Sequence, residues 1–136
     1  MTEITFAVSG TPVTQGSTKA FVVGGRARVT HDKSKALMDW RGDIAHAAQE
    51  AAHGRFAAVG VPVSLSATFY LQRPASAPKK VLFPTKKPDL DKLVRSLLDA
   101  GTGVLWADDS QVVAIQASKA FAPRAPGVQV EVCWND

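Results

Sequence analysis

The sequence is poor in cysteine and has no long apolar segment, and each shortage excludes a class of protein. Its single cysteine, Cys133, can form no intrachain disulfide and cannot supply the set of thiolates that a structural zinc site needs. No run of about 18 consecutive apolar residues occurs, so we expect no transmembrane helix and no membrane partner. The first residues also lack the basic and apolar segments of a signal peptide. These features predict a cytoplasmic protein.

Acidic residues are also in the minority. The 136 residues include 12 aspartates and glutamates against 16 lysines and arginines, which gives a net charge of +4 and a pI near 9.5. A basic surface favours a polyanionic partner such as nucleic acid. The length, with 46% hydrophobic and 21% charged residues, is typical of one soluble globular domain spanning residues 1–136.

The few acidic residues are concentrated between Pro88 and Val113. Five of the twelve lie in this stretch, and they are Asp89, Asp91, Asp99, Asp108 and Asp109. A basic chain that gathers its carboxylates in one segment is expected to use them. We interpret the segment as a metal-dependent nuclease site.

The first half of this segment predicts a helix that begins at Asp91. Pro88 favours an extended entry into this segment. If the backbone stays extended after Pro88, Asp89 and Asp91 would point to the same side because they are two residues apart. The Asp91 carboxylate suits the N-cap position of the helix. Arg95 comes four residues after Asp91, so the two side chains share a helix face. Apolar residues that recur at helical spacing form the expected buried stripe, namely Leu93, Val94, Leu97 and Leu98.

The second half places Asp108 and Asp109 at a turn before a strand predicted over residues 111–117. If this strand packs beside the start of the helix, one of these carboxylates can approach Asp89 and Asp91. Carboxylates held together repel one another, and a divalent cation removes the repulsion. Oxygen ligands favour Mg²⁺, with Mn²⁺ as the alternative. Arg95 could then hold a phosphate oxygen or stabilise the transition state.

Each of these residues also has an ordinary structural explanation. Asp91 could act only as a helix cap, Asp108 and Asp109 could form a common turn, and Arg95 could pair with Asp99 at the surface. Taken together, these explanations do not account for the clustering of acidic residues in a basic chain. Spacing alone leaves both interpretations open.

The rest of the chain predicts an α+β fold with a mixed or antiparallel sheet and two main helices. Strands are expected over residues 4–8, 61–71 and 128–134, and a hairpin over residues 20–23 and 26–30 about Gly24 and Gly25. A helix capped by Asp32 or Ser34 is expected to end near Ala52. The strands over residues 111–117 and 128–134 are expected to form an antiparallel pair.

Residues 72–87 form a proline-rich, basic segment that leads directly into Asp89. A loop of about 16 residues is longer than compact domains usually contain without a function. We interpret it as a clamp on the DNA backbone rather than a linker. The candidate DNA-binding residues are Arg73, Lys79, Lys80, Lys86 and Lys87 in this loop, Lys92 after it, and Lys19 in the hairpin, where a merely solvated surface is an equal alternative.

Two segments carry a resemblance to a known family. They read Asp89-Leu90-Asp91-Lys92-Leu93 and Trp106-Ala107-Asp108-Asp109-Ser110-Gln111-Val112-Val113, in this order. The pattern resembles the RusA-type Holliday junction resolvases, which are crossover junction endodeoxyribonucleases common in phages and prophages. The resemblance implies a Mg²⁺-dependent homodimer that nicks four-way DNA junctions in recombination and repair. By position, it also implies that Asp89, Asp91 and Asp109 are catalytic metal ligands, that Asp108 is a neighbouring acidic position, and that Arg95 occupies the place of an essential lysine.

Two residues depart from the family pattern. Lys92 replaces the usual asparagine, and Arg95 replaces the lysine. Arginine is planar and lysine is a point charge, so the second exchange is not silent. Lys92 puts a cation beside the expected metal ligands, where it could weaken metal binding or contact phosphate.

We therefore predict a resolvase in which a metal at the aspartates activates water for attack on a phosphodiester, while Arg95 neutralises the phosphate. The alternatives are a nuclease for flaps or other branched DNA, and a structure-specific DNA-binding protein that has lost activity. Two symmetric nicks favour a homodimer. Its interface is expected on the apolar stripe of the second helix and on the run Val104-Leu105-Trp106, with packing on the sheet as the alternative.

Overall fold

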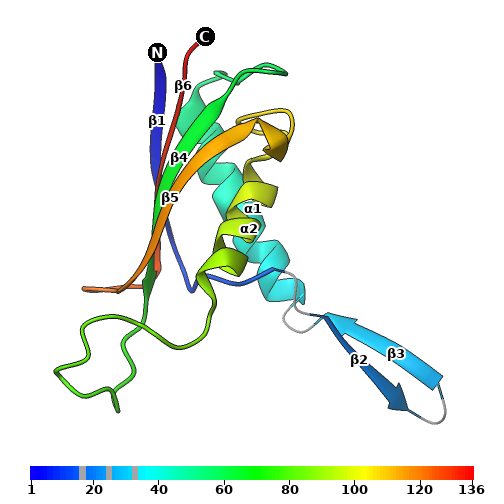
Figure 1. Cartoon of the computed structure of the whole chain (residues 1–136), viewed down its shortest axis with the longest axis vertical. Helices are drawn as coiled ribbons and strands as arrows, with labels where there is room; N and C mark the ends of the chain where they lie inside the picture. The colour runs from blue at the N-terminus through cyan, green and yellow to red at the C-terminus, as the bar shows by residue number, and fades with distance from the viewer. Residues whose placement is uncertain (16–17, 24–25, 32–33) are drawn as a thin grey trace.

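The computed structural model describes residues 1–15, 18–23, 26–31 and 34–136, and the side chains within 1–15 and 35–136. Along the chain, a strand is followed by a hairpin, a helix, a second strand, a second helix and two further strands (Figure 1). The elements are β1 (Thr2–Ser9), β2 (Thr18–Val23), β3 (Arg26–His31), α1 (Ser34–Ala52), β4 (Val63–Leu71), α2 (Leu90–Gly101), the single 3₁₀ turn η1 (Asp109–Gln111), β5 (Val112–Phe121) and β6 (Gly127–Trp134).

Four strands form one mixed sheet in the order β1-β6-β4-β5. β6 is antiparallel to both β1 and β4, whereas β5 is parallel to β4. The predicted α+β class, with a mixed sheet and two main helices, is therefore confirmed. The predicted antiparallel pairing of the last two strands is wrong, because β4 lies between β5 and β6 and hydrogen-bonds to both.

Both helices cover one face of this sheet, and the core lies between the two layers (Figure 1). Alternation along β4 turns one set of side chains toward the helices, and this whole set is buried, namely Val63, Leu65, Ala67, Phe69 and Leu71. α1 contributes Trp40, Ile44 and Ala48 at helical spacing to the same core. The predicted strand and the predicted long helix are confirmed.

The second helix begins earlier than its sequence suggests. Leu90 is its first residue, and Asp89 occupies the N-cap position with an extended backbone and no side-chain capping hydrogen bond. Asp91 therefore lies in the first helical turn, where a carboxylate favours the helix dipole. The predictions that Asp91 caps the helix and that Asp89 and Asp91 share one side of an extended segment are wrong.

The apolar residues proposed as an interface belong to the core of the chain. Leu93 and Leu97 of α2 are buried against the sheet, and Leu105 and Trp106 are buried with them. Trp106 packs its ring directly on Gly101, where a Cβ atom would overlap the indole. The alternative, packing on the sheet, is therefore confirmed for these four residues, because burying them within one chain already removes them from water. Val94, Leu98 and Val104 are partly buried, and an interface on them stays a prediction.

The β2–β3 pair is an antiparallel hairpin with Thr18 opposite His31 and Val23 opposite Arg26. The predicted hairpin is confirmed in its backbone pairing. Its turn at Gly24 and Gly25, the candidate cap Asp32 and the side chain of Lys19 lie outside the described residues. In the described part of the chain, no helix has the length and apolar character required to span a membrane.

Candidate functional site

The structure separates the two halves of the acidic segment by the length of α2. Asp89 and Asp91 lie at the start of this helix, whereas Asp108 and Asp109 follow its C-terminal end. A helix of 12 residues spans about 18 Å. Figure 1 shows β5 starting beside the end of α2 and running back past the helix. The condition that β5 begins beside the start of the helix is therefore not met within one chain.

Lys119 marks which end of β5 reaches the start of α2. Its ammonium donates hydrogen bonds to the carbonyl oxygens of Pro88 and Lys86, at 3.0 and 2.9 Å. Lys119 is the eighth residue of the ten in β5, so the far end of the strand adjoins Asp89. Sequence reasoning missed this lysine, although a cation on the face shared by Ile115 and Phe121 was a visible signal.

The aspartates of one chain do not form a complete metal site. Among the described residues, the group of three potential ligands whose ligand atoms lie within 4.8 Å of one another is Glu3, Glu131 and Cys133. A divalent cation held by protein carboxylates needs several oxygen ligands at one point. A single chain therefore offers Asp89 and Asp91 at one place and Asp108 and Asp109 at another.

The Glu3, Glu131 and Cys133 group lies on the face of the sheet opposite the helices. Glu3 and Cys133 are paired across β1 and β6, and the Cys133 thiol lies 3.7 Å from a carboxylate oxygen of Glu131. Burial raises the pKa of the Cys133 thiol, and the charges of Glu131 and Glu3 raise it further. In the absence of a bound cation, this environment favours the neutral thiol over the thiolate.

Lys92 lies beside the first carboxylate of the acidic segment. Its ammonium is 3.8 Å from the Oδ2 atom of Asp89, and both side chains are about half exposed. A pair so open to solvent contributes little to stability. The pair matters for the site instead, because it places a cation next to a candidate metal ligand. The family pattern has asparagine at this position.

Arg95 lies one turn after Asp91 on the exposed side of α2. The alternative explanation paired it with Asp99. No ion pair or side-chain hydrogen bond joins Arg95 to a partner in the part of the chain with described side chains. The guanidinium is therefore open to an anion that approaches the Asp91 end of the helix.

A buried glutamine holds the Asp108–Asp109 turn in place. The Oε1 atom of Gln111 accepts hydrogen bonds from the backbone N–H groups of Ala107 and Asp108, both at 3.0 Å. Its Nε2 atom donates to the carbonyl oxygens of Ala58 and Val61 at 2.8 and 3.1 Å. The glutamine in the segment Asp-Asp-Ser-Gln thus has a positioning role, which sequence reasoning missed although the residue stood in the motif.

The same turn presents its two carboxylates to solvent. The backbone N–H of Ser110 donates to Asp108, and this bond, together with the Ser110 hydroxyl and Asp109, holds the pKa of the Asp108 carboxyl below its usual value. Asp108 is therefore engaged in capping the turn. Asp109 is exposed beside it and is the better candidate ligand of the two.

A strap from residues 10–15 runs along the start of α2. The hydroxyl of buried Ser96 donates to the carbonyl oxygen of Val13 at 3.0 Å, and the N–H of Gln15 donates to that of Lys92 at 3.3 Å. Ser96 lies outside the apolar stripe of α2. Its burial shows that the strap covers the side of α2 that carries this serine, while Asp91 and Arg95 stay exposed.

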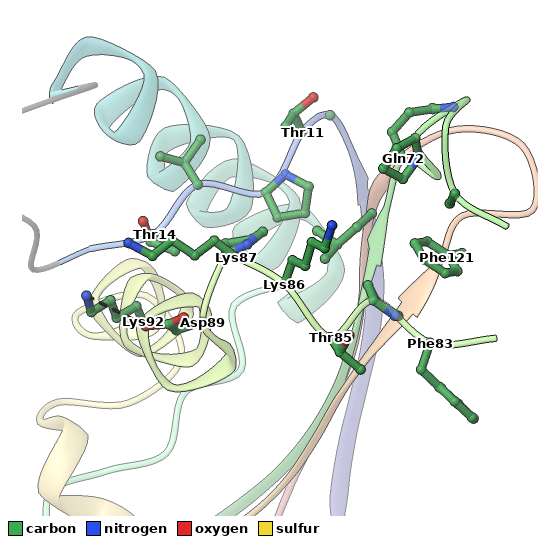
Figure 2. A pocket seen from close by; sticks show the side chains of 18 of the residues that line it. Thr11, Thr14, Gln72, Phe83, Thr85, Lys86, Lys87, Asp89, Lys92 and Phe121 are labelled. Atoms are coloured by element: carbon green, nitrogen blue, oxygen red, sulfur yellow. Dashed lines mark ion pairs between the residues drawn. The ribbon is translucent and has the colours of Figure 1, made fainter. Parts of the chain in front are cut away.

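The strap and the 72–87 loop enclose a cleft of about 1160 Å³ next to Asp89. This volume lies just above the roughly 300–1,000 Å³ of pockets that bind small molecules. Figure 2 shows Asp89 and Lys92 at one end of the cleft, with Phe83 and Phe121 at the other. Lys86 and Lys87 also line it.

The basic residues of the 72–87 loop differ in exposure and in hydrogen bonding. The four lysines predicted to bind DNA are exposed, namely Lys79, Lys80, Lys86 and Lys87. Arg73 instead donates to the carbonyl oxygens of Val81 and Pro78, at 2.8 and 2.6 Å, and its guanidinium lies over the ring of Phe121. The structure thus gives Arg73 a role in shaping the loop.

Comparisons with known proteins agree with the resemblance that the two acidic motifs carry. A family described as "Endodeoxyribonuclease RusA" matches residues 9–133, a range that contains the strap, the basic loop and both acidic pairs. The chain is also similar to the "Uncharacterized protein YqaN" of Bacillus subtilis (strain 168), with 32% identity over 140 residues that cover 95% of this chain and 94% of that protein. This chain belongs to the RusA endodeoxyribonuclease family.

Proposed function

We propose that this protein is a metal-dependent endonuclease that resolves four-way DNA junctions in recombination and repair. The observation that carries the proposal is the match to the endodeoxyribonuclease family over residues 9–133, which includes both acidic motifs in the expected order. The net charge of +4 and the exposed lysines beside Asp89 support a DNA substrate. The same resemblance favours a phage or prophage origin and action in the bacterial cytoplasm.

We further propose that the protein acts as a homodimer whose sites are shared between the two chains. The support is the distance between the two acidic pairs, because α2 holds them apart within one chain. A second copy can supply the missing carboxylates. Resolution by two symmetric nicks also requires two sites related by a two-fold axis.

The edge of β5 is the surface that suits such a dimer. β5 is an outer strand of the described sheet, so one side of its backbone is free to pair. Val113 and Ile115 on this strand are 68% and 43% exposed, so the strand also offers two large apolar side chains to a partner. Pairing two β5 strands about a two-fold axis would cover both the backbone edge and these side chains.

Antiparallel pairing of the two β5 strands would also bring the carboxylates together. The start of one strand would lie opposite the end of the other. Asp109 precedes the start of β5, and Lys119 near its end contacts the backbone just before Asp89. Asp109 of the partner subunit would therefore approach Asp89 and Asp91 in each of two equivalent sites.

Each residue then has a defined task. Asp89 and Asp91, with Asp109 of the partner subunit, would hold Mg²⁺ or Mn²⁺, since carboxylate oxygens are the ligands that these ions prefer. The bound ion would supply activation of water and neutralise charge on the phosphate. Arg95, on the face of α2 that carries Asp91, would hold a phosphate oxygen. Lys86, Lys87 and their neighbours would position the DNA backbone.

One observation favours a second candidate function. Lys92 lies 3.8 Å from Asp89, and its charge opposes a cation at the same carboxylate. The second candidate is a protein that binds branched DNA but does not cut it.

A cleavage assay separates these functions. Synthetic four-way junctions, flaps and linear duplex of the same sequence would be incubated with the protein in Mg²⁺, in Mn²⁺ and in EDTA. We expect paired nicks in the junction with either metal and none in EDTA. Junction binding without cleavage in both metals would support the binding protein, and cleavage of flaps alone would support a different branched substrate.

A further inference from the structure

The loop between β4 and α2 carries an apolar tip that the described part of the chain leaves exposed. Leu82 is 72% exposed and Phe83 is 65% exposed. Two lysine pairs flank this tip, Lys79-Lys80 before it and Lys86-Lys87 after it. Exposed apolar side chains that are adjacent and rimmed by polar residues mark contact surfaces, and this tip has both features.

The backbone on both sides of the tip is anchored in spite of this exposure. Arg73 donates to the carbonyl oxygens of Pro78 and Val81, directly before Leu82. Lys119 donates to the carbonyl oxygen of Lys86 at 2.9 Å, shortly after Phe83. The loop therefore presents its tip in a formed shape, so little conformational entropy remains to be lost on binding.

The charge around the tip identifies its partner as a polyanion. Four exposed lysines flank the two apolar side chains along the loop, and no acidic residue occurs between Gln72 and Pro88. Lysines of this kind bind phosphates, whereas exposed aromatic and aliphatic side chains insert between bases. A tip that offers both in one anchored loop matches a nucleic acid whose bases are accessible.

We propose that Leu82 and Phe83 form a wedge that inserts at the branch point of a DNA junction, while the lysine pairs hold the flanking phosphates. This proposal rests on the proposed function and adds the element that distinguishes a junction from a duplex. Inserting a side chain requires bases to unstack, and this costs less where stacking is already interrupted. Phe83 and Asp89 line the same cleft, so insertion would bring a branch-point strand to the acidic residues.

A fluorescence experiment tests the wedge without cleavage. The wild-type protein in EDTA would be titrated into a four-way junction with 2-aminopurine at the branch point. A duplex of matching sequence would carry 2-aminopurine at the same sequence position. We expect the fluorescence to rise on binding to the junction, because the base becomes unstacked. Phe83→Ala and Leu82→Ala should each remove most of this rise and weaken junction binding about tenfold, with duplex binding unchanged.

Two control variants separate the wedge from other effects. Phe56→Ala removes an exposed aromatic side chain at the opposite end of β4, and we expect wild-type fluorescence and affinity. Lys79→Ala with Lys80→Ala should weaken junction and duplex binding alike and reduce the salt dependence of both. Thermal unfolding of each variant shows whether it is folded.

Several results would overturn the wedge. One is a Phe83→Ala, Leu82→Ala double variant that keeps the wild-type fluorescence rise and the wild-type preference for junctions, while the wild-type protein cuts junctions normally, and in that case only the wedge fails. Another is a double variant that sediments as a smaller species than the wild-type protein but gives the same fluorescence rise. That result would make the tip a contact between copies of the chain. A wild-type protein with no preference for junctions would overturn both the wedge and the proposed function.

Discussion

Sites shared between two chains predict that two inactive variants restore each other's activity. We expect Asp91→Asn and Asp109→Asn each to abolish cleavage alone, because each removes one candidate ligand from both sites of the dimer. In a mixed dimer, the two changes meet in one site and leave the other site with every carboxylate. If all ligands came from one chain, each site of the mixed dimer would carry one of the changes, and both would be inactive.

The size of the restored activity follows from counting sites. Random exchange in an equal mixture gives about half mixed dimers, each with one intact site of two, so about a quarter of the wild-type number of sites is expected. A mixed dimer has one working site, so its product should be a junction nicked on one strand. Denaturing gels would measure the nick, and native gels would show that resolved duplexes are scarce.

A matched mixture provides the control. Asp89 and Asp91 lie at the same end of α2, so they belong to the same half of each shared site. Mixing Asp89→Asn with Asp91→Asn should restore no nicking, because each site of that mixed dimer retains one damaged half. Failure of the Asp91→Asn and Asp109→Asn mixture to nick junctions, with subunit exchange shown by differently tagged chains, would refute the shared site.

Four further changes test other parts of the argument. Ile115→Lys should shift the protein toward monomer in analytical ultracentrifugation and reduce cleavage, whereas Met38→Lys, at an exposed apolar residue of α1, should do neither. Lys92→Asn should lower the Mg²⁺ concentration that gives half-maximal cleavage, because it removes the cation 3.8 Å from Asp89, and an unchanged metal dependence would count against that role. Arg95→Ala should slow cleavage by about 100-fold while Arg95→Lys retains most of the rate, and equal rates for all three proteins would remove Arg95 from the site. Gly101→Ala should cost about 1–3 kcal/mol in urea unfolding, because the new Cβ would overlap Trp106, whereas Gly42→Ala in α1, which has open space around it, should be neutral or stabilising.

The sequence by itself determined the local structure and the identity of the candidate residues. Alternating side chains identified β4, and helical spacing identified both helices, because burial of one face imposes a period on each element. The two acidic motifs were likewise visible in the sequence, since they are short and contiguous. The basic loop was recognised from its prolines and lysines, although the exposed tip was not.

Only the tertiary structure decided how these elements meet. The same alternation is compatible with several strand orders, and it did not reveal that β4 lies between β5 and β6. The direction of α2 relative to β5 separates Asp89 and Asp91 from Asp109, and no spacing in the sequence encodes that direction. The hydrogen bonds of Lys119 to Pro88 and of Gln111 to Ala58 likewise join residues that are 31 and 53 positions apart. Hydrophobic patterning specifies which face of an element is buried, whereas the partners of each polar group depend on which elements are brought together by packing.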